Sequence, residues 1–211
     1  MKSTARFFMS VVIGASLVVG FGANPAQAQP APDQLVAELT DEFYEKLEAN
    51  REHYRNNPEA LKAEIDQRMR KHMDTQYAAR LVLGRHGRAL TPEAIDRFAE
   101  ALAANLMDQY ATRVLEFDSD NEFTVLPTNA NQNPKRTRVR TRLRLENGSV
   151  MPIDFVLRWQ DEQWRLFDVI VEGISYVATY RTQVGEQIRQ QGFEAMLQRL
   201  ESGDVELDAS R

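Results

Sequence analysis

The feature that most constrains the fold of this chain is a change in the spacing of its apolar residues near Phe117. Before this point apolar residues recur about every four positions, as on one face of a helix; after it they alternate with polar residues, as in a half-buried strand. Helical spacing returns after Glu172. The order of helices, strands and helices predicts an α+β fold, in which a twisted antiparallel sheet packs against several helices.

Four helices are expected before the change in spacing, from Leu35 to about Tyr54, from Pro58, from Thr75 to Leu83, and from Pro92. Asn57 and Thr91 stand where a helix N-cap is expected, each followed by proline, which suits the first turn. Two more helices follow the strands, separated by Gly192. The long apolar stripes are Leu35, Leu39, Phe43 and Leu47; Leu61, Ile65, Met69 and Met73; and Ile95, Phe98, Leu102, Leu106, Tyr110 and Val114.

The strand region predicts a meander. A short strand at Phe123–Leu126 precedes a loop, and the dipeptide Asn147-Gly148 is a strong hairpin signal between two longer alternating segments, 138–145 and 150–159. A turn at Gln160–Glu162 leads into the last strand. Strict alternation there places Trp164, Leu166 and Ile170 on one face, and Phe167, Val169 and Val171 on the other.

The first 28 residues have the pattern of a secretory signal peptide. Lys2 and Arg6 precede an apolar run from Phe7 to Phe21, and Ala26-Gln27-Ala28 is a small-x-small cleavage pattern. The run is shorter than the roughly 20 residues that span a bilayer. The expected mature protein is a single domain over residues 29–211, with a flexible lead at 29–33 and a frayed tail from about residue 202. Export without cysteine fits a bacterial periplasm.

The amino-acid composition argues against several classes of catalytic and binding function. The chain has no cysteine, only three histidines and a net charge of −5, and it contains no glycine-rich phosphate loop, HExxH motif or nucleophile elbow. Nucleic-acid binding, thiol chemistry and multi-histidine metal sites are therefore disfavoured. Asp154 and Asp168, on neighbouring predicted strands, remain as possible acid–base groups, although a place on the solvent face of the sheet explains them as well.

Five arginines, at alternate positions from Arg136 to Arg144, share one face of a predicted strand. This arginine ladder could dock an anionic partner; the simpler interpretation is a solvated face neutralised by cross-strand acids such as Asp154. The abundant large apolar side chains are similarly ambiguous. They either fill one core or surround an apolar cavity between sheet and helices, and periodicity does not separate these alternatives.

The segment Trp164–Ser175, with the sequence WRLFDVIVEGIS, resembles the signature of the MlaC family, also called the toluene-tolerance auxiliary proteins. Tyr180-Arg181-Thr182-Gln183 resembles that family's Y-R-x-Q motif, and the resemblance covers most of residues 34–201. It implies a periplasmic phospholipid carrier that shuttles lipid between an outer-membrane lipoprotein complex and an inner-membrane ABC transporter. The implied fold is α+β with a pocket for acyl tails, and the implied protein is a non-enzymatic monomer whose only bound molecule is its lipid cargo.

With the resemblance, the expected lipid-binding residues are the apolar ones facing such a pocket. Asp168 and Ser175 are expected to hold the strand-to-helix junction. The alternatives left open are a small α+β enzyme, such as an isomerase or dehydratase, with Asp168 or Asp154 as base, and a ligand-free adaptor with a filled core. The expected lining residues are Phe98, Leu102, Leu106, Ile153, Phe155, Leu157, Phe167, Val169, Ile174, Val177 and Tyr180.

Overall fold

The computed structural model describes residues 30–116, 122–128, 135–145, 147–205 and 207. The proposed signal peptide lies outside these residues. Among them no helix has the length and apolarity needed to cross a bilayer. The helices are α1 (Pro32–Ala49), α2 (Arg51–Asn56), α3 (Pro58–His72), α4 (Thr75–Leu83), α5 (Pro92–Tyr110), α6 (Tyr176–Gln191) and α7 (Phe193–Glu201), with 3₁₀ helices η1 (Gly84–Ala89) and η2 (Ala111–Glu116).

Helix starts follow local chemistry. The side chains of Asn57, Thr91 and Ser175 each accept a hydrogen bond from the backbone N–H three residues later, which satisfies one of the unpaired donors of the first turn. Two boundaries differ from expectation. The predicted flexible lead already contains Pro32, the first residue of α1, and the long first helix is interrupted at Asn50, so that α2 turns the chain back toward α3.

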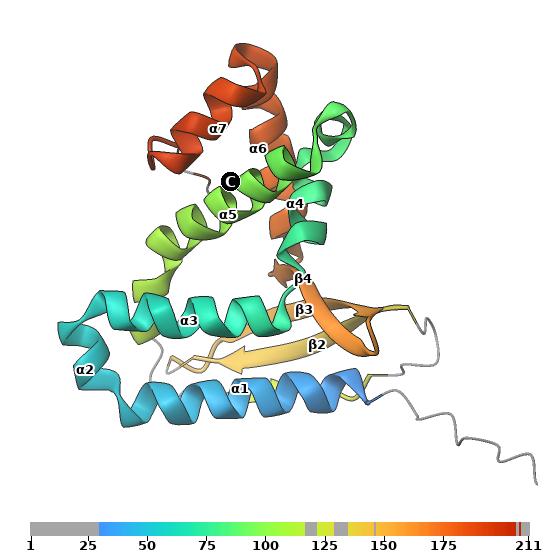
Figure 1. The fold of residues 1–211 in the computed structure, drawn as a ribbon. Coiled ribbons are helices and arrows are strands. Elements are labelled where there is room, and N and C mark those ends of the chain that lie inside the picture. The colour runs from blue at the N-terminus through green and yellow to red at the C-terminus, as the bar shows by residue number, and fades with distance from the viewer. Residues whose placement is uncertain (1–29, 117–121, 129–134, 146, 206, 208–211) are drawn as a thin grey trace, which may run out of the picture.

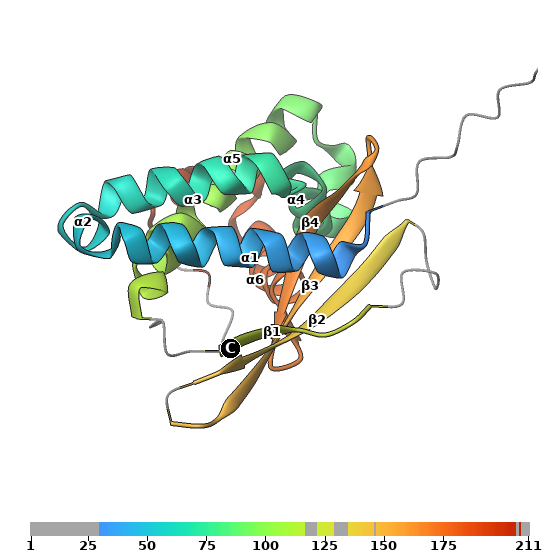
Figure 2. The same cartoon turned by 90° about the horizontal axis from the view of Figure 1, so that it is seen from below.

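The strands are β1 (Glu122–Val125), β2 (Arg136–Arg144), β3 (Val150–Gln160), β4 (Gln163–Val171) and β5 (Ile174–Ser175). They form one antiparallel sheet in the order β1-β2-β3-β4-β5, which confirms the predicted α+β meander. Gly148 in the β2–β3 hairpin has φ +79°, a conformation that glycine adopts without strain. Figures 1 and 2 show α1 and α3 side by side along the sheet, with α4 to α7 gathered beyond α3.

A β-bulge in β4 changes which side chains share a face. Leu157 pairs with Leu166 and Val156 with Asp168, so Phe167 is an extra residue without a partner of its own. After the bulge Val169 pairs with Phe155, on the same face as Leu166. The strict alternation expected for this strand is therefore wrong beyond Leu166.

Among the residues that the structure describes, the interior is divided into three apolar clusters rather than one core. The first joins α4, α5, α6 and α7; the second joins α1 to the sheet around Val139 and Trp164; the third, Leu47, Tyr54 and Leu61, fills the elbow between α1, α2 and α3. The C-terminal segment contributes to the first cluster, because Val205 and Leu207 are 4% and 1% exposed. These two residues are packed, contrary to the expected frayed tail.

Candidate lipid-binding site

A cavity of about 380 Å³ lies between α1, α3 and the sheet; we call it the sheet cavity. Leu39 and Phe43 of α1 line it on one side, and Phe155, Leu157 and Leu166 contribute from the strands. Its surface is almost entirely apolar. The apolar stripe of α1, for which the sequence left core and cavity open, therefore faces open space over part of its length.

A second cavity, of about 290 Å³, lies among α3, α4, α5, α6 and β4; we call it the helical cavity. Leu102 and Leu106 of α5, Phe167 of β4, and Val177 and Tyr180 of α6 line it. Each cavity is near the lower end of the ~300–1,000 Å³ range of small-molecule sites.

The two cavities share one wall. Ile65, Met69 and Met73 of α3, together with Val114 of η2, line both of them. Thioether side chains are flexible and adapt to irregular apolar contents. A partition built from two methionines, one isoleucine and one valine is therefore a deformable boundary between two apolar spaces.

Eight of the eleven expected lining residues face one of these cavities: Phe155 and Leu157 the sheet cavity, and Leu102, Leu106, Phe167, Val169, Val177 and Tyr180 the helical cavity. Three do not. Phe98 is fully buried in the cluster of α5 and α7, with its ring centroid 6.5 Å from that of Phe193. Ile153 and Ile174 line neither cavity, and Ile174, at the sheet edge, is 44% exposed.

The sequence reasoning missed the contribution of α1 and α3. Their regular apolar stripes were visible, but a stripe that faces a cavity has the same spacing as one that faces a core. The missed residues are Leu35, Val36, Leu39, Phe43, Ile65, Met69, Met73, Ala78, Val82, Met107, Ala111, Val114, Phe123, Trp164, Leu166 and Tyr176, with the polar Thr40, Tyr44, Arg68 and His72.

Asp168 lies at the helical cavity but is engaged in the strand-to-helix junction. It is 8% exposed, and its two carboxylate oxygens accept hydrogen bonds from the Ser175 hydroxyl at 2.6 Å and from the Val177 N–H at 3.0 Å. Asp168 and Ser175 thus have the structural role expected of them. The other interpretation of Asp168, as a solvated residue on the exposed face of the sheet, is wrong because its side chain is buried.

The arginine ladder is partly neutralised within the sheet, as expected. Asp154 forms ion pairs with Arg138 at 2.5 Å and Arg142 at 3.7 Å, and Arg144 lies 3.3 Å from Glu122. Asp154 is only 4% exposed, although it lies opposite the exposed Arg140 in the register of β2 and β3. Asp154 therefore shares the face of the arginine ladder and pairs with it as predicted, but it is buried there instead of solvated.

Burial also affects ionisable groups at the sheet cavity, such as Tyr44, and beside it, such as Glu64, which pairs with the lining residue Arg68. Burial raises the pKa of the Tyr44 hydroxyl above its ordinary value, and the nearby Arg51 opposes this increase. Lys46 and Arg68 hold the pKa of the Glu64 carboxyl below its ordinary value, against the opposing and largest single effect of its desolvation. Tyr44 therefore stays neutral, and Glu64 stays charged, at neutral pH.

Two apolar cavities on a common wall, held between a meander sheet and its helices, define a class of protein: a binding protein for apolar ligands. The comparisons with known proteins agree. The family described as MlaC protein matches residues 37–202, so the chain belongs to the MlaC family. This is a periplasmic family of phospholipid-binding transport proteins, which are carriers and not enzymes.

Two curated relatives and one solved structure illustrate the similarity. Toluene tolerance protein Ttg2D of Pseudomonas putida is 28% identical over 187 residues, covering 87% of this chain and 86% of the relative. The intermembrane phospholipid transport system binding protein MlaC of Haemophilus influenzae is 19% identical, covering 83% of each chain. A phospholipid-binding protein from Ralstonia solanacearum, solved with a phospholipid, has the same fold at a TM-score of 0.74 and 18% identity, covering 82% of this chain and 96% of that one.

Proposed function

We propose that this protein is a periplasmic phospholipid carrier. The acyl chains of the bound lipid occupy the sheet and helical cavities during transfer between membranes. The observation that carries the proposal is the pair of apolar cavities on one deformable wall, in a member of the MlaC family. Residues 29–211 form the carrier, and residues 1–28 direct its export as a cleaved signal peptide.

The energetics of transfer explain why such a cavity is needed. A diacyl lipid with about 30 methylenes, at about 0.8 kcal/mol each, loses roughly 24 kcal/mol on entering water. Moving from the bilayer into an apolar cavity avoids most of this cost, because the lipid exchanges one hydrocarbon environment for another. No covalent step is required, so the residues have only to exclude water and present apolar surface.

The partners follow from the same energetics. A lipid that must not cross water has to be passed on by direct contact, so the carrier docks on a complex at each membrane. We propose an outer-membrane lipoprotein complex and an inner-membrane ABC transporter with its lipid-receiving subunit. The Haemophilus relative, named as the binding protein of an intermembrane phospholipid transport system, supports this assignment.

Native mass spectrometry of protein purified without detergent tests the carrier function. We expect a co-purifying mass in the phospholipid range, identified as intact lipid after extraction. The bare polypeptide mass, together with no uptake of lipid from vesicles, would favour the ligand-free adaptor and overturn the proposal.

A further inference from the structure

The polar side chains of the sheet cavity come from the two helices that face each other across it. Thr40 and Tyr44 lie on α1, and Arg68 and His72 on α3. Members of each pair are four residues apart, so each pair occupies one helical face. The polar part of the cavity is therefore concentrated on these two helices, while the other lining residues are apolar, apart from the indole N–H of Trp164, which donates to the carbonyl oxygen of Pro30.

The guanidinium of Arg68 has more N–H donors than it has hydrogen-bond acceptors in the described part of the chain. Its Nε donates to Glu64 at 2.8 Å, its Nη2 donates to the carbonyl oxygen of Glu42 at 3.4 Å, and its closest approach to the Glu42 carboxylate is 3.8 Å. Its guanidinium lies 5.6 Å from the centre of the Phe43 ring, and its side chain is 24% exposed. A guanidinium has five N–H donors, and Glu42 is a weak competitor because its side chain is 64% exposed.

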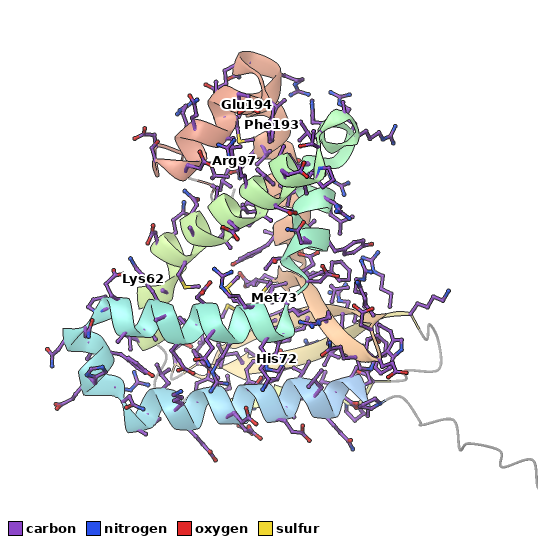
Figure 3. All side chains as sticks on the ribbon, in the orientation of Figure 1. Lys62, His72, Met73, Arg97, Phe193 and Glu194 are labelled. Atoms are coloured by element: carbon purple, nitrogen blue, oxygen red, sulfur yellow. The ribbon has the colours of Figure 1, made fainter. Side chains whose placement is uncertain are left out.

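His72 lies one turn further along α3, on the side that faces α1 (Figure 3). It is half-buried and lines the sheet cavity, yet its imidazole makes no hydrogen bond or ion pair with any residue in the described part of the chain. Arg165 donates a hydrogen bond to the carbonyl oxygen of Lys71 at 2.7 Å, which brings another cation to the same end of α3.

The charged groups around His72 are predominantly cationic. Burial lowers the pKa of its imidazole, and Lys71, Arg165 and Arg68 lower it further, while only Glu42 acts in the opposite direction. The imidazole is therefore neutral at neutral pH and can donate one hydrogen bond. An unpaired donor among three cations, beside an apolar cavity, suits an anion that carries apolar chains.

We infer that Arg68 and His72 bind the phosphodiester group of the lipid, at the polar edge of the sheet cavity. This inference rests on the proposed carrier function. A guanidinium matches phosphate oxygens in geometry and charge, and the imidazole N–H supplies a second donor from the same helical face. The acyl chains extend from this point over Leu39 and Phe43 into the apolar part of the cavity.

A competition experiment tests the assignment on the delipidated mature protein. Equimolar dioleoylphosphatidylglycerol and dioleoylglycerol are offered, and the bound ratio is read by native mass spectrometry. The two lipids share their acyl chains and differ by the phosphate-containing head group. We expect the wild type to prefer the phospholipid, and Arg68→Gln, which removes the charge, and His72→Leu, which removes the N–H donor, each to reduce that preference about tenfold, the effect of one charge-assisted hydrogen bond.

Lys62→Gln is the matched control. Lys62 lies on the same helix, is paired with Asp108 at 2.7 Å and Glu59 at 3.0 Å, and lines neither cavity (Figure 3). This variant is expected to keep the wild-type preference. An unchanged preference in folded Arg68→Gln and His72→Leu would overturn the phosphodiester site while leaving the carrier function intact. A wild type that binds neither lipid would contradict the carrier function itself.

A measurement on the unaltered protein guards against variants that fail to fold. The chain has only three histidines, so the imidazole signals of His72 can be followed by NMR through a pH titration. Bound phosphatidylglycerol should raise the pKa of His72 relative to the protein holding dioleoylglycerol. Equal pKa values in the two complexes would overturn the inference.

Discussion

The hydroxyl of Ser175 donates a hydrogen bond to the carboxylate of Asp168 at 2.6 Å, across the junction between β4 and α6. The same hydroxyl accepts a hydrogen bond from the Ala178 N–H at 3.0 Å and so caps α6. This short chain of hydrogen bonds sets the direction in which α6 leaves the sheet. It thereby places Val177 and Tyr180 on the wall of the helical cavity.

Ser175→Ala should destabilise the protein by about 1–3 kcal/mol, because it removes the helix cap and leaves one oxygen of the buried Asp168 without its donor. The free energy of unfolding in urea measures this loss. Thr182→Ala is the control, since the exposed Thr182 hydroxyl bonds only to a carbonyl of its own helix and its removal should cost less than about 0.5 kcal/mol. Equal losses in the free energy of unfolding would show that the hydrogen bonds of Ser175 at the junction stabilise the protein no more than an exposed hydroxyl does.

Val177→Arg should lower the amount of phospholipid bound per protein severalfold, because it places a charge in the apolar helical cavity. Leu102→Arg should act in the same direction. Lipid extraction and mass spectrometry of the folded variants measure the loading. Ile174→Arg, three residues away, is the control, because Ile174 is 44% exposed and lines neither cavity. Normal loading in Val177→Arg would remove that residue from the proposed site.

Arg138→Gln should destabilise the fold by about 1–2 kcal/mol, because it leaves the buried Asp154 carboxylate with the more distant Arg142 and a long hydrogen bond, 3.4 Å, from the Thr141 N–H. The cost is moderated by solvent, since the Arg138 side chain is 50% exposed. Arg140→Gln should change stability by less than about 0.5 kcal/mol, as Arg140 is exposed and forms no ion pair with the residues described. Urea denaturation of both variants compares them, and an equal loss would argue against a special role for the Asp154 pairs.

His72 should make the stability of the lipid-free protein pH-dependent. Its pKa is lowered in the folded protein, chiefly by burial, from an ordinary value of 6.5. The unfolded chain therefore binds the proton more readily, so the stability due to neutral His72 is present above pH 6.5 and is lost as the pH falls through the folded pKa. In urea titrations from pH 7.5 to about 5, His72→Gln should lose stability less steeply than the wild type. Identical slopes would show that burial at this position does not disfavour the charged imidazole.

Local chemistry made much of the secondary structure predictable. Asn57 and Thr91 cap the helices expected of them, and the Asn147-Gly148 turn joins the strands on either side. These features depend on hydrogen bonds between residues close in sequence. Boundaries were less predictable where a distant contact competes, as at Asn50, where the break in the first helix allows Leu47, Tyr54 and Leu61 to meet.

The candidate site was only partly predictable. Leu102, Leu106 and Val177 were expected at a cavity and lie at one, whereas Phe98, on the same stripe as Leu102, is packed against α7. The bulge at Phe167 is invisible to strict alternation and moves Val169 to the face of Leu166. Arg68 and His72 carried no local signal, because charged residues on a helix are ordinarily solvated.

The sequence by itself determined the order of helices and strands, the faces on which apolar residues gather, and the likeness to the MlaC family. Only the tertiary structure decided which of those faces meet protein and which meet open space. The physical reason is that periodicity records the preference of a side chain for an apolar environment and not what supplies that environment. The distances between α1, α3, α5 and the sheet follow from packing among three separate clusters, and these distances leave the two cavities open.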